Sequence, residues 1–356
     1  MGNQVWAVCK DPGGTASILP AVRELRRRRV PVTLFGNGKA VELLTNRGEK
    51  FTPASDTQSV LSQHSPPRVL LTSMCGDGGV GRDLVPLLWD QSKIVAVQDF
   101  WGAQLLTSWS DQQYRPHVIC VNDRVGSELV EKAWPDFHPS QVIITGYPAL
   151  DKYVNYDATK ADRATRDTLD ITLDEYVILF GGQLEGSGAM LSELIEALNV
   201  IGTPITLIAR PHPRMSNDAP EEMTLWSQSL RQRQTGRIVD SAKVSDVRAL
   251  ISTASLVVSM YSTMLVEAAV MRRDNISLLY PKVGAKQLCE STGGLMSDFP
   301  LVTLGCSQKA EHIDQLIQLI RRAINTSLAL RADQERTFRL DGHNSSRVAD
   351  LIASLM

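Results

Sequence analysis

Short apolar runs alternate with amphipathic stretches of helical spacing along almost the whole chain. In the first half the runs VLLTS, IVAVQ, VICV and VIIT are apolar at consecutive positions, as strands covered by helices on both faces are. Strands separated by helices of 10 to 15 residues predict β-α-β units and a parallel sheet. We expect strands at residues 4–9, 32–35, 68–73, 93–98, 118–121 and 141–145, and helices at 16–29, 39–46, 84–89 and 124–133.

The alternation stops at residues 151–174, which are polar and poor in large aliphatic side chains, and then restarts. Further strands are expected at 176–180, 205–209, 237–239, 256–259, 276–280 and 301–304, and helices at 190–200, 221–234, 244–252, 263–272, 310–328, 331–340 and 345–355. This pattern predicts an α/β protein with two doubly wound, Rossmann-like domains, 1–150 and 175–330, a linker at 151–174 and C-terminal helices at 331–356. Because such sheets bind ligands beyond the carboxyl ends of their strands, we expect the site in a cleft between the domains.

Composition narrows the class of protein without indicating a chemistry. Of 356 residues, 43% are apolar and 21% charged, and 37 Lys and Arg against 39 Asp and Glu give a net charge of -2, so no general grip on nucleic acid is expected. Five scattered cysteines without a Cys-x-x-Cys pair argue against a disulfide framework or structural zinc, and favour the cytoplasm. No apolar run reaches membrane-spanning length, and we expect no secretion signal at the start.

The first loop with a candidate role follows the first expected strand. Asp11, Gly13 and Gly14 precede a helix, so the backbone can approach another group closely and the helix start favours an anion. The spacing matches neither G-x-G-x-x-G nor a P-loop. Asp11 is therefore either an ordinary helix cap or a group at the cleft.

A second glycine-rich loop, at residues 180–188, follows the first strand of the second domain. It contains Gly181, Gly182 and Gln183, and four of its nine residues are glycine. Because glycine costs entropy on ordering, we interpret the loop as a contact for phosphate or sugar, with a flexible hinge as the alternative.

The loop Arg210-Pro211-His212-Pro213-Arg214 is the most informative, because it directly follows the strand ITLIA. Two prolines stiffen the backbone around the histidine, and two arginines supply the charge and fork geometry that suit phosphate. We therefore expect Arg210, His212 and Pro213 to lie at a phosphate site, although a lone histidine is more often structural.

Ser262 and Thr263 follow the next strand, where a helix begins, so hydroxyls and unbonded backbone N–H groups can meet an anion together. Glu267 lies four residues further, on the same helix face as Thr263, and its carboxylate could accept bonds from ribose hydroxyls. Ordinary helix capping explains Ser262 and Thr263 equally well.

These motifs resemble those of the two-domain (GT-B) glycosyltransferase superfamily. Arg-Pro-His-Pro followed by Ser-Thr is similar to motifs of bacterial sialyltransferases, CDP-glycerol glycerophosphotransferases and capsule-polysaccharide transferases. The segments at 143–151 (IITGYPALD) and 341–349 (DGHNSSRVA) resemble parts of UDP-N-acetylglucosamine 2-epimerases and chain ends in the superfamily.

The resemblance implies a GT-B-like fold with an acceptor-side first domain and a second domain that binds a nucleotide-activated donor. His212, Ser262 and Thr263 would hold donor phosphate, and Glu267 the ribose. The chain lacks the epimerases' His-Arg-Arg-Glu-Asn stretch, which makes an epimerase the weaker alternative. The acidic-acidic-Gly motif of sialyltransferases is also not evident.

Glycosyl transfer with inversion needs a base for the acceptor hydroxyl. We rank Asp11 first and Asp99 second, with Asp77 as a further carboxylate after a strand. Phe100 and Trp101 are either stacking groups for an acceptor or core residues.

No Asp-x-Asp pair occurs in the chain, so we expect transfer without a divalent metal and without a cofactor beyond the nucleotide-sugar co-substrate. Arginine, histidine and helix starts can stabilise a leaving phosphate instead. The alternative is a metal bound by donor phosphates and one carboxylate, Asp77 or Glu185.

Arg26, Arg27, Arg28 and Arg29 end the first expected helix, where cations are favourable. The alternative is a patch that contacts an anionic membrane surface or a polyanionic acceptor.

The sequence therefore predicts a transferase of polysaccharide biosynthesis that moves a sugar, or a related group, from a nucleotide-activated donor to an acceptor hydroxyl. An epimerase and a non-catalytic nucleotide-sugar-binding protein are the alternatives. A glycan, a lipid-linked sugar and a modified nucleic acid all stay open as acceptors.

Overall fold

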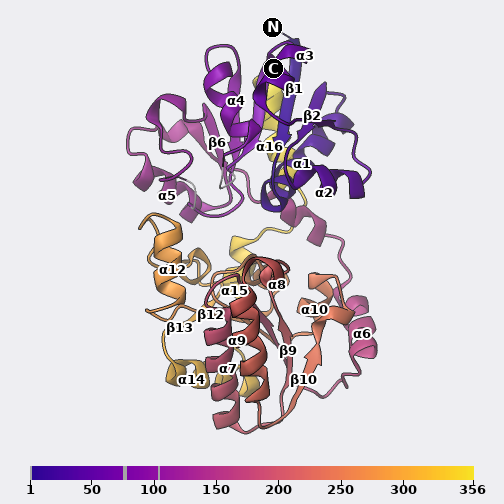
Figure 1. Ribbon diagram of the computed structural model, residues 1–356, viewed down its shortest axis with the longest axis vertical. Coiled ribbons are helices and arrows are strands. Elements are labelled where there is room, and N and C mark those ends of the chain that lie inside the picture. The colour runs from indigo at the N-terminus through magenta and orange to yellow at the C-terminus, as the bar shows by residue number, and fades with distance from the viewer. Residues whose placement is uncertain (1, 75–77, 103–104) are drawn as a thin grey trace. The chain divides into compact units, whose positions relative to one another are not determined.

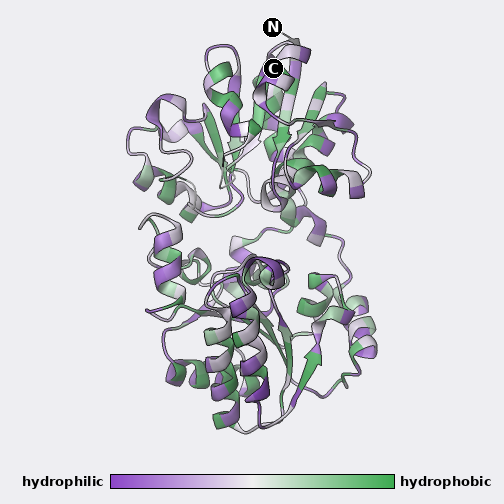
Figure 2. Cartoon of the chain, in the orientation of Figure 1, coloured by the Kyte–Doolittle hydropathy of each residue, from purple (hydrophilic) through white to green (hydrophobic). Residues whose placement is uncertain are grey.

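The computed structural model describes residues 2–74, 78–102 and 105–356, and the chain forms two compact units (Figure 1). Unit 1 contains the chain up to Val154 together with Ser291–Met296 and Leu340–Met356, and unit 2 contains Asn155–Glu290 and Ser297–Arg339. Each unit has its own parallel sheet. The strands are apolar on both faces, so each sheet is covered by helices on both sides, which exclude water. Figure 2 shows hydrophobic strands in both sheets and helices that carry a polar and an apolar side.

The sheet of unit 1 has the strand order β3-β2-β1-β4-β5-β6-β7. Its strands are β1 (Gly2–Cys9), β2 (Val32–Gly36), β3 (Thr52–Pro53), β4 (Pro67–Ser73), β5 (Lys93–Val97), β6 (Val118–Val121) and β7 (Val142–Ile144). Its helices are α1 (Pro12–Arg27), α2 (Ala40–Asn46), α3 (Thr57–Gln63), α4 (Val80–Leu88), α5 (Arg124–Ala133) and α16 (Asn344–Ser354), with short 3-10 helices η1 (Gln112–Tyr114), η2 (Pro139–Gln141) and η3 (Pro148–Tyr153). The direction of winding reverses between β1 and β4, which is where doubly wound sheets bind ligands.

The sheet of unit 2 has the order β10-β9-β8-β11-β12-β13, with the same reversal between β8 and β11. Its strands are β8 (Val177–Gly181), β9 (Thr206–Arg210), β10 (Arg237–Asp240), β11 (Leu256–Ser259), β12 (Asp274–Leu278) and β13 (Gln308–Ala310). Its helices are α6 (Ala158–Leu169), α7 (Ser187–Ile201), α8 (Met215–Asp218), α9 (Pro220–Arg231), α10 (Val247–Thr253), α11 (Thr263–Val270), α12 (Gly284–Ser291), α13 (Pro300–Thr303), α14 (Ile313–Asn325) and α15 (Arg331–Thr337), with the 3-10 helix η4 (Ser241–Lys243).

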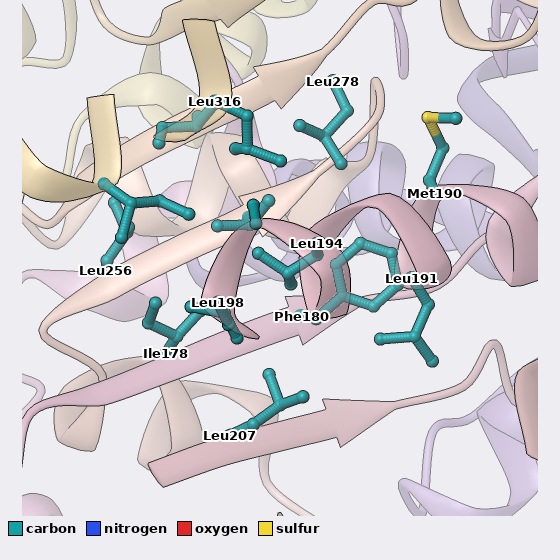
Figure 3. Packing of buried hydrophobic residues seen from close by; sticks show 14 of the residues in the cluster. Ile178, Phe180, Met190, Leu191, Leu194, Leu198, Leu207, Leu256, Leu278 and Leu316 are labelled. Atoms are coloured by element: carbon teal, nitrogen blue, oxygen red, sulfur yellow. The ribbon is translucent and has the colours of Figure 1, made fainter. Parts of the chain in front are cut away.

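The core of unit 2 forms where α7 packs on the sheet. Figure 3 shows Leu191, Leu194 and Leu198 of α7 against Ile178 and Phe180 of β8, and all five side chains are buried. Their helical and strand periodicities bring the apolar stripe of α7 onto the covered face of β8. The ends of both elements, where the loops lie, are thereby held in place.

The C-terminal helix α16 belongs to unit 1 rather than to a separate segment at 331–356. Val348, Ala349 and Ile352 pack into the same buried cluster as Ile18 and Val22 of α1. Asp151 holds the start of α16, because its carboxylate accepts the N–H groups of Asn344 (3.1 Å) and Ser345 (2.8 Å) and the Ser345 hydroxyl. The motifs at 143–151 and 341–349 therefore contact each other and close unit 1.

Two expected elements differ from the structure. Residues 301–304, expected as a strand, lie in or next to the helix α13, and the last strand of the sheet is β13 instead. Pro300 explains the difference, because proline suits the first turn of a helix. The expected linker at 151–174 contains the end of η3, in unit 1, and helix α6, which packs on α10 in unit 2.

Candidate functional site

Three loops meet at the carboxyl edge of the unit 2 sheet, because β9, β8 and β11 are neighbours. The Gly182 N–H donates to the Arg210 carbonyl (2.9 Å), which joins the loops after β8 and β9. The Tyr261 N–H donates to Oε1 of Gln183 (3.4 Å), which joins the loops after β8 and β11. The structure thus brings together the three segments that the sequence analysis selected in the second domain.

The Arg210 side chain is used within the protein. Its guanidinium donates to the carbonyls of Val244 (2.9 Å), Ser245 (3.1 Å) and Ser241 (3.5 Å). Burial lowers the pKa of Arg210, although the carboxylate of Asp246 opposes that shift. Arg210 therefore holds the loop at 241–245 in place, a role different from the expected phosphate contact.

The imidazole of His212 is oriented by its own turn. Its Nδ1 accepts the N–H of Arg214 (3.2 Å), so in the neutral ring the proton lies on Nε2, which can donate to an anion. Pro213 is exposed, and the Arg214 guanidinium pairs with Asp218 (3.0 Å). The short helix α8 starts directly after this turn.

Ser262 is the N-cap of α11, and its hydroxyl accepts the Met264 N–H (3.2 Å). Thr263, the first residue of the helix, is exposed, and the Leu265 N–H of the same turn donates to the Ser262 carbonyl (3.0 Å). Glu267 is partly buried on the same helix. Helix capping thus explains Ser262. Thr263 lies at the carboxyl edge of the sheet, close to the point between β8 and β11 where the direction of winding reverses.

The glycines of the loop at 180–188 are explained by packing. A Cβ atom on Gly181 would lie 2.6 Å from the Met264 sulfur, and one on Gly182 would lie 2.7 Å from the Trp226 ring. Larger residues would push α11 and α9 away from the sheet. Close packing of helices therefore accounts for these two glycines, and their expected contact with a ligand stays a prediction.

The N-terminus of α7 already has an anion. One carboxylate oxygen of Glu222 accepts the N–H of Gly186 (2.8 Å), and the other accepts the N–H of Gly188 (2.9 Å). Glu222 comes from α9, so this contact also fastens α9 to α7. The sequence analysis missed Glu222, because no local motif signals a cap that arrives from 34 residues away.

The carboxyl edge of the unit 1 sheet brings Asp11 and Asp99 together. Asp11 is the N-cap of α1, with Oδ1 accepting the Gly14 N–H (2.7 Å). A Cβ atom on Gly13 would lie 2.9 Å from Oδ2 of Asp99 and 3.5 Å from Oδ1 of Asp11. Only glycine at position 13 therefore allows the Asp99 carboxyl to approach the start of α1.

Burial, together with the negative charge of Asp11, raises the pKa of Asp99 to about 7, and hydrogen bonds from the backbone N–H groups of Phe100 and Asp99 only partly oppose the shift. A carboxyl group with this pKa is in part protonated and in part ionised near neutral pH. It can accept a proton in that range more effectively than an ordinary aspartate.

Asp123 and Lys10 lie at the same edge and were missed. Asp123 caps α5, accepts the Trp101 indole N–H (2.8 Å), and has its pKa raised by burial. The rule that selected Asp99, a charged residue in the loop after a buried strand, selects both of these residues as well. Trp101 is buried, which favours the core role over acceptor stacking.

The arginines at the end of α1 are mostly paired with carboxylates. Arg27 and Arg28 both bond to Glu24, and Arg26 donates to Glu49 (3.3 Å). Arg28 also pairs with Asp350 of α16. The structure thus favours a solvated helix end, with most of its arginines in ion pairs, over the alternative membrane-facing patch.

Within residues 2–74, 78–102 and 105–356, no three His, Cys, Asp or Glu side chains lie close enough together to hold a metal ion. Glu185 is exposed, and Asp77 lies outside the described residues. Among the helices that the structure describes, none is long and apolar enough to cross a membrane.

Two Rossmann-ordered sheets with polar loops at their carboxyl edges define the GT-B type of nucleotide-dependent enzyme. The family model of CDP-glycerol:poly(glycerophosphate) glycerophosphotransferases matches residues 107–354, and the chain belongs to this family. No curated protein matches the sequence.

Solved structures share the fold over nearly the whole chain. The UDP-GlcNAc 2-epimerase of Neisseria meningitidis, bound to UDP-GlcNAc, is 13% identical with a TM-score of 0.69, covering 99% of this chain and 100% of that one. A glycosyltransferase of Rickettsia africae is 10% identical with a TM-score of 0.64, covering 99% and 98%. The wall teichoic acid polymerase TagF is 11% identical with a TM-score of 0.59, covering 99% and 89%.

These comparisons confirm the expected fold class and superfamily. They also confirm the prediction that the protein is a transferase that uses a nucleotide-activated donor. The family name specifies glycerol phosphate, which is a related group rather than a sugar. The roles of individual site residues stay predictions.

Proposed function

We propose that this transferase moves glycerol phosphate from CDP-glycerol to a hydroxyl of a poly(glycerophosphate) chain. The observation that carries the proposal is the family match over residues 107–354, which includes the histidine loop and the start of α11. In the reaction, the acceptor oxygen bonds to the phosphorus that carries glycerol. The bond from that phosphorus to the bridging oxygen breaks, and CMP leaves with the electron pair.

The donor phosphates would bind at the carboxyl edge of unit 2. The Nε2–H of His212 and the hydroxyl of Thr263, together with the partial positive charge of the α11 start, would favour an anion. Glu267 would accept ribose hydroxyls. Arg210 would act through the loop at 241–245, since its guanidinium bonds to three carbonyls there.

Asp99 would accept the proton of the acceptor hydroxyl, with Asp11 as the neighbour that raises its pKa. This order reverses the sequence-based ranking. Asp11 is engaged as the cap of α1, whereas the pKa of Asp99 of about 7 suits proton transfer near neutral pH.

The test measures CMP release from CDP-glycerol with and without a short poly(glycerophosphate) acceptor, and analyses the acceptor by mass spectrometry. We expect acceptor-dependent CMP release and lengthening by glycerophosphate units. Conversion of UDP-GlcNAc to its 2-epimer, without any use of CDP-glycerol, would favour the epimerase alternative. Parallel assays after EDTA treatment, with and without Mg²⁺ or Mn²⁺, test our proposal that His212, Thr263 and the start of α11 suffice without a metal.

A further inference from the structure

A groove of about 500 Å³ opens on unit 1 along one face of α1. Ala16, Leu19 and Arg23 line one wall at the spacing of a single helix face, together with Pro20. Pro148, Ala149, Asp151 and Lys152 of η3 also line the groove, as does Arg47, which follows the end of α2. All of these residues belong to unit 1, where α1, α2 and α16 lie side by side (Figure 1).

The groove carries more positive than negative charge. Arg23, Arg47 and Lys152 line it, and no ion pair is found for the exposed Arg47 in the described part of the chain. The Arg23 guanidinium bonds to Glu49 (2.6 Å), but that carboxylate is shared with Arg26, so the pair of arginines keeps a surplus positive charge.

The carboxylate in the lining, Asp151, is directed to the start of α16. It accepts N–H groups from Asn344 and Ser345, and the partial positive charge of the helix start offsets its own charge. Asp151 therefore opposes an anion in the groove less than its formal charge suggests.

The floor of the groove is apolar, with one polar feature. Ala16, Pro20 and Ala149 are partly exposed and contribute apolar surface, as the glycerol carbons of a ligand would require. Pro20 lies inside α1 and has no N–H, so the Ala16 carbonyl lacks its usual helical donor and can accept a hydroxyl. The groove thus offers basic side chains for the phosphates of a ligand, apolar surface for its carbon atoms and a carbonyl for its hydroxyl groups.

We propose that this groove binds the phosphodiester chain of the acceptor, behind the hydroxyl that reacts. The inference rests on the proposed function, because it takes Asp99 as the reacting end. Ala16 lies five residues beyond Asp11, about one and a half helical turns. A polymer whose terminal hydroxyl reaches Asp99 can continue past Ala16 toward Arg23, with its phosphates near Arg47 and Lys152.

The experiment compares the full-length protein with a double variant, Arg47→Glu and Lys152→Glu, by calorimetry with a synthetic oligo(glycerophosphate) of several repeats. We expect binding to weaken by roughly tenfold or more, since two attractive charge contacts become repulsive. The control is a second double variant, Lys93→Glu and Lys160→Glu, an equal charge change on exposed residues of β5 and α6, and it should leave binding intact.

Acceptor length supplies the second measurement. For the unaltered protein, the acceptor KM should fall as the oligomer lengthens, because added repeats enter the groove, and the double variant should lose this dependence. CMP release with glycerol as a minimal acceptor should stay unchanged, since the groove lies behind the reacting hydroxyl.

Equal oligomer affinity in the unaltered protein and the double variant would overturn the groove assignment, even with full transferase activity. Charge-dependent binding to phosphatidylglycerol vesicles without oligomer binding would overturn it in favour of a lipid surface. If CDP-glycerol is never used, the proposed function fails, while calorimetry still decides whether the groove binds a phosphodiester chain.

Discussion

Among single residues, Asp11 and Asp99 show how surroundings divide two similar side chains into different roles. Both approach the same glycine, Gly13, but Asp11 accepts a helix N–H, whereas partial burial raises the pKa of Asp99. Because only the ionised carboxylate can take a proton, transfer should decline as the pH falls below the pKa of Asp99.

The first prediction compares Asp99→Asn with Asp11→Asn. Asp99→Asn should lower kcat by about 10²–10⁴-fold, the usual share of a general base. Asp11→Asn keeps a good N-cap and removes a negative charge, so activity should persist and the acid limb should move to lower pH. The measurement is kcat/KM against pH for both variants. An unchanged acid limb in Asp11→Asn would show that the two carboxyl groups are not coupled.

The second prediction concerns His212, whose Nε2–H can donate to an anion when Nδ1 accepts from Arg214. His212→Ala should weaken CDP-glycerol binding by roughly 1.5–3 kcal/mol, the scale of a hydrogen bond to a charged group. Calorimetry on the folded variant measures this, with His138→Ala in unit 1 as the control. Unchanged affinity would remove His212 from the donor site.

The site residues were predictable from sequence to the extent that they follow strands. Asp99, His212 and Thr263 were selected by that rule, and all lie at carboxyl edges of the sheets. The rule could not reveal that the Arg210 guanidinium turns to the loop at 241–245, since side-chain direction depends on tertiary contacts. Nor could it reveal the pKa of Asp99, which depends on burial.

At the scale of elements, α7 and α9 are joined by a cap as well as by apolar packing. Our third prediction is that Glu222→Ala lowers the free energy of unfolding by about 1–3 kcal/mol, because two N–H groups lose a charged acceptor. Urea unfolding measures the change, and Glu221→Ala, its exposed neighbour on α9, should have a much smaller effect. Donor affinity should not increase; a tighter donor complex would instead locate the phosphate at α7.

The loop at 241–245 depends on Arg210 in the same way. Our fourth prediction is that Arg210→Lys, which keeps the charge but loses the fork, speeds amide hydrogen exchange in this loop by releasing its carbonyls. Exchange read by mass spectrometry checks this. If exchange is unchanged and only donor affinity falls, then the guanidinium contacts the donor directly.

Element types were predicted best where apolar periodicity was strong, as for α7 and β8. The expected strand at 301–304 failed because four apolar residues behind a proline fit a short buried helix equally well. The brief strands β3 and β13 offer too few residues for periodicity to be detected.

At the scale of the whole molecule, each unit has its own core, so each can unfold in its own transition. The fifth prediction is that Asp151→Ala destabilises unit 1 by about 1–2 kcal/mol, the scale of a lost helix cap, and leaves unit 2 unaffected. Asp157→Ala, which removes the cap of α6, should do the reverse.

Tryptophan fluorescence separates the two transitions, because Trp226 is the one tryptophan of unit 2 and the other five lie in unit 1. Replacing Trp226 with Phe leaves a signal from unit 1 alone. A single transition that shifts equally in both Asp variants would mean that the units unfold together.

The return of the chain to unit 1 at Leu340 reverses the order in which the two units are completed during synthesis. Residues up to Val154 emerge from the ribosome first, but their core is complete only when α16 has been made, because Val348, Ala349 and Ile352 belong to it. Unit 2 has all its residues once Arg339 has emerged, so the second half of the gene encodes the domain that can mature first. With the donor site in unit 2, as proposed, a nascent chain halted shortly before α16 would already bind the donor while unit 1 still depended on chaperones.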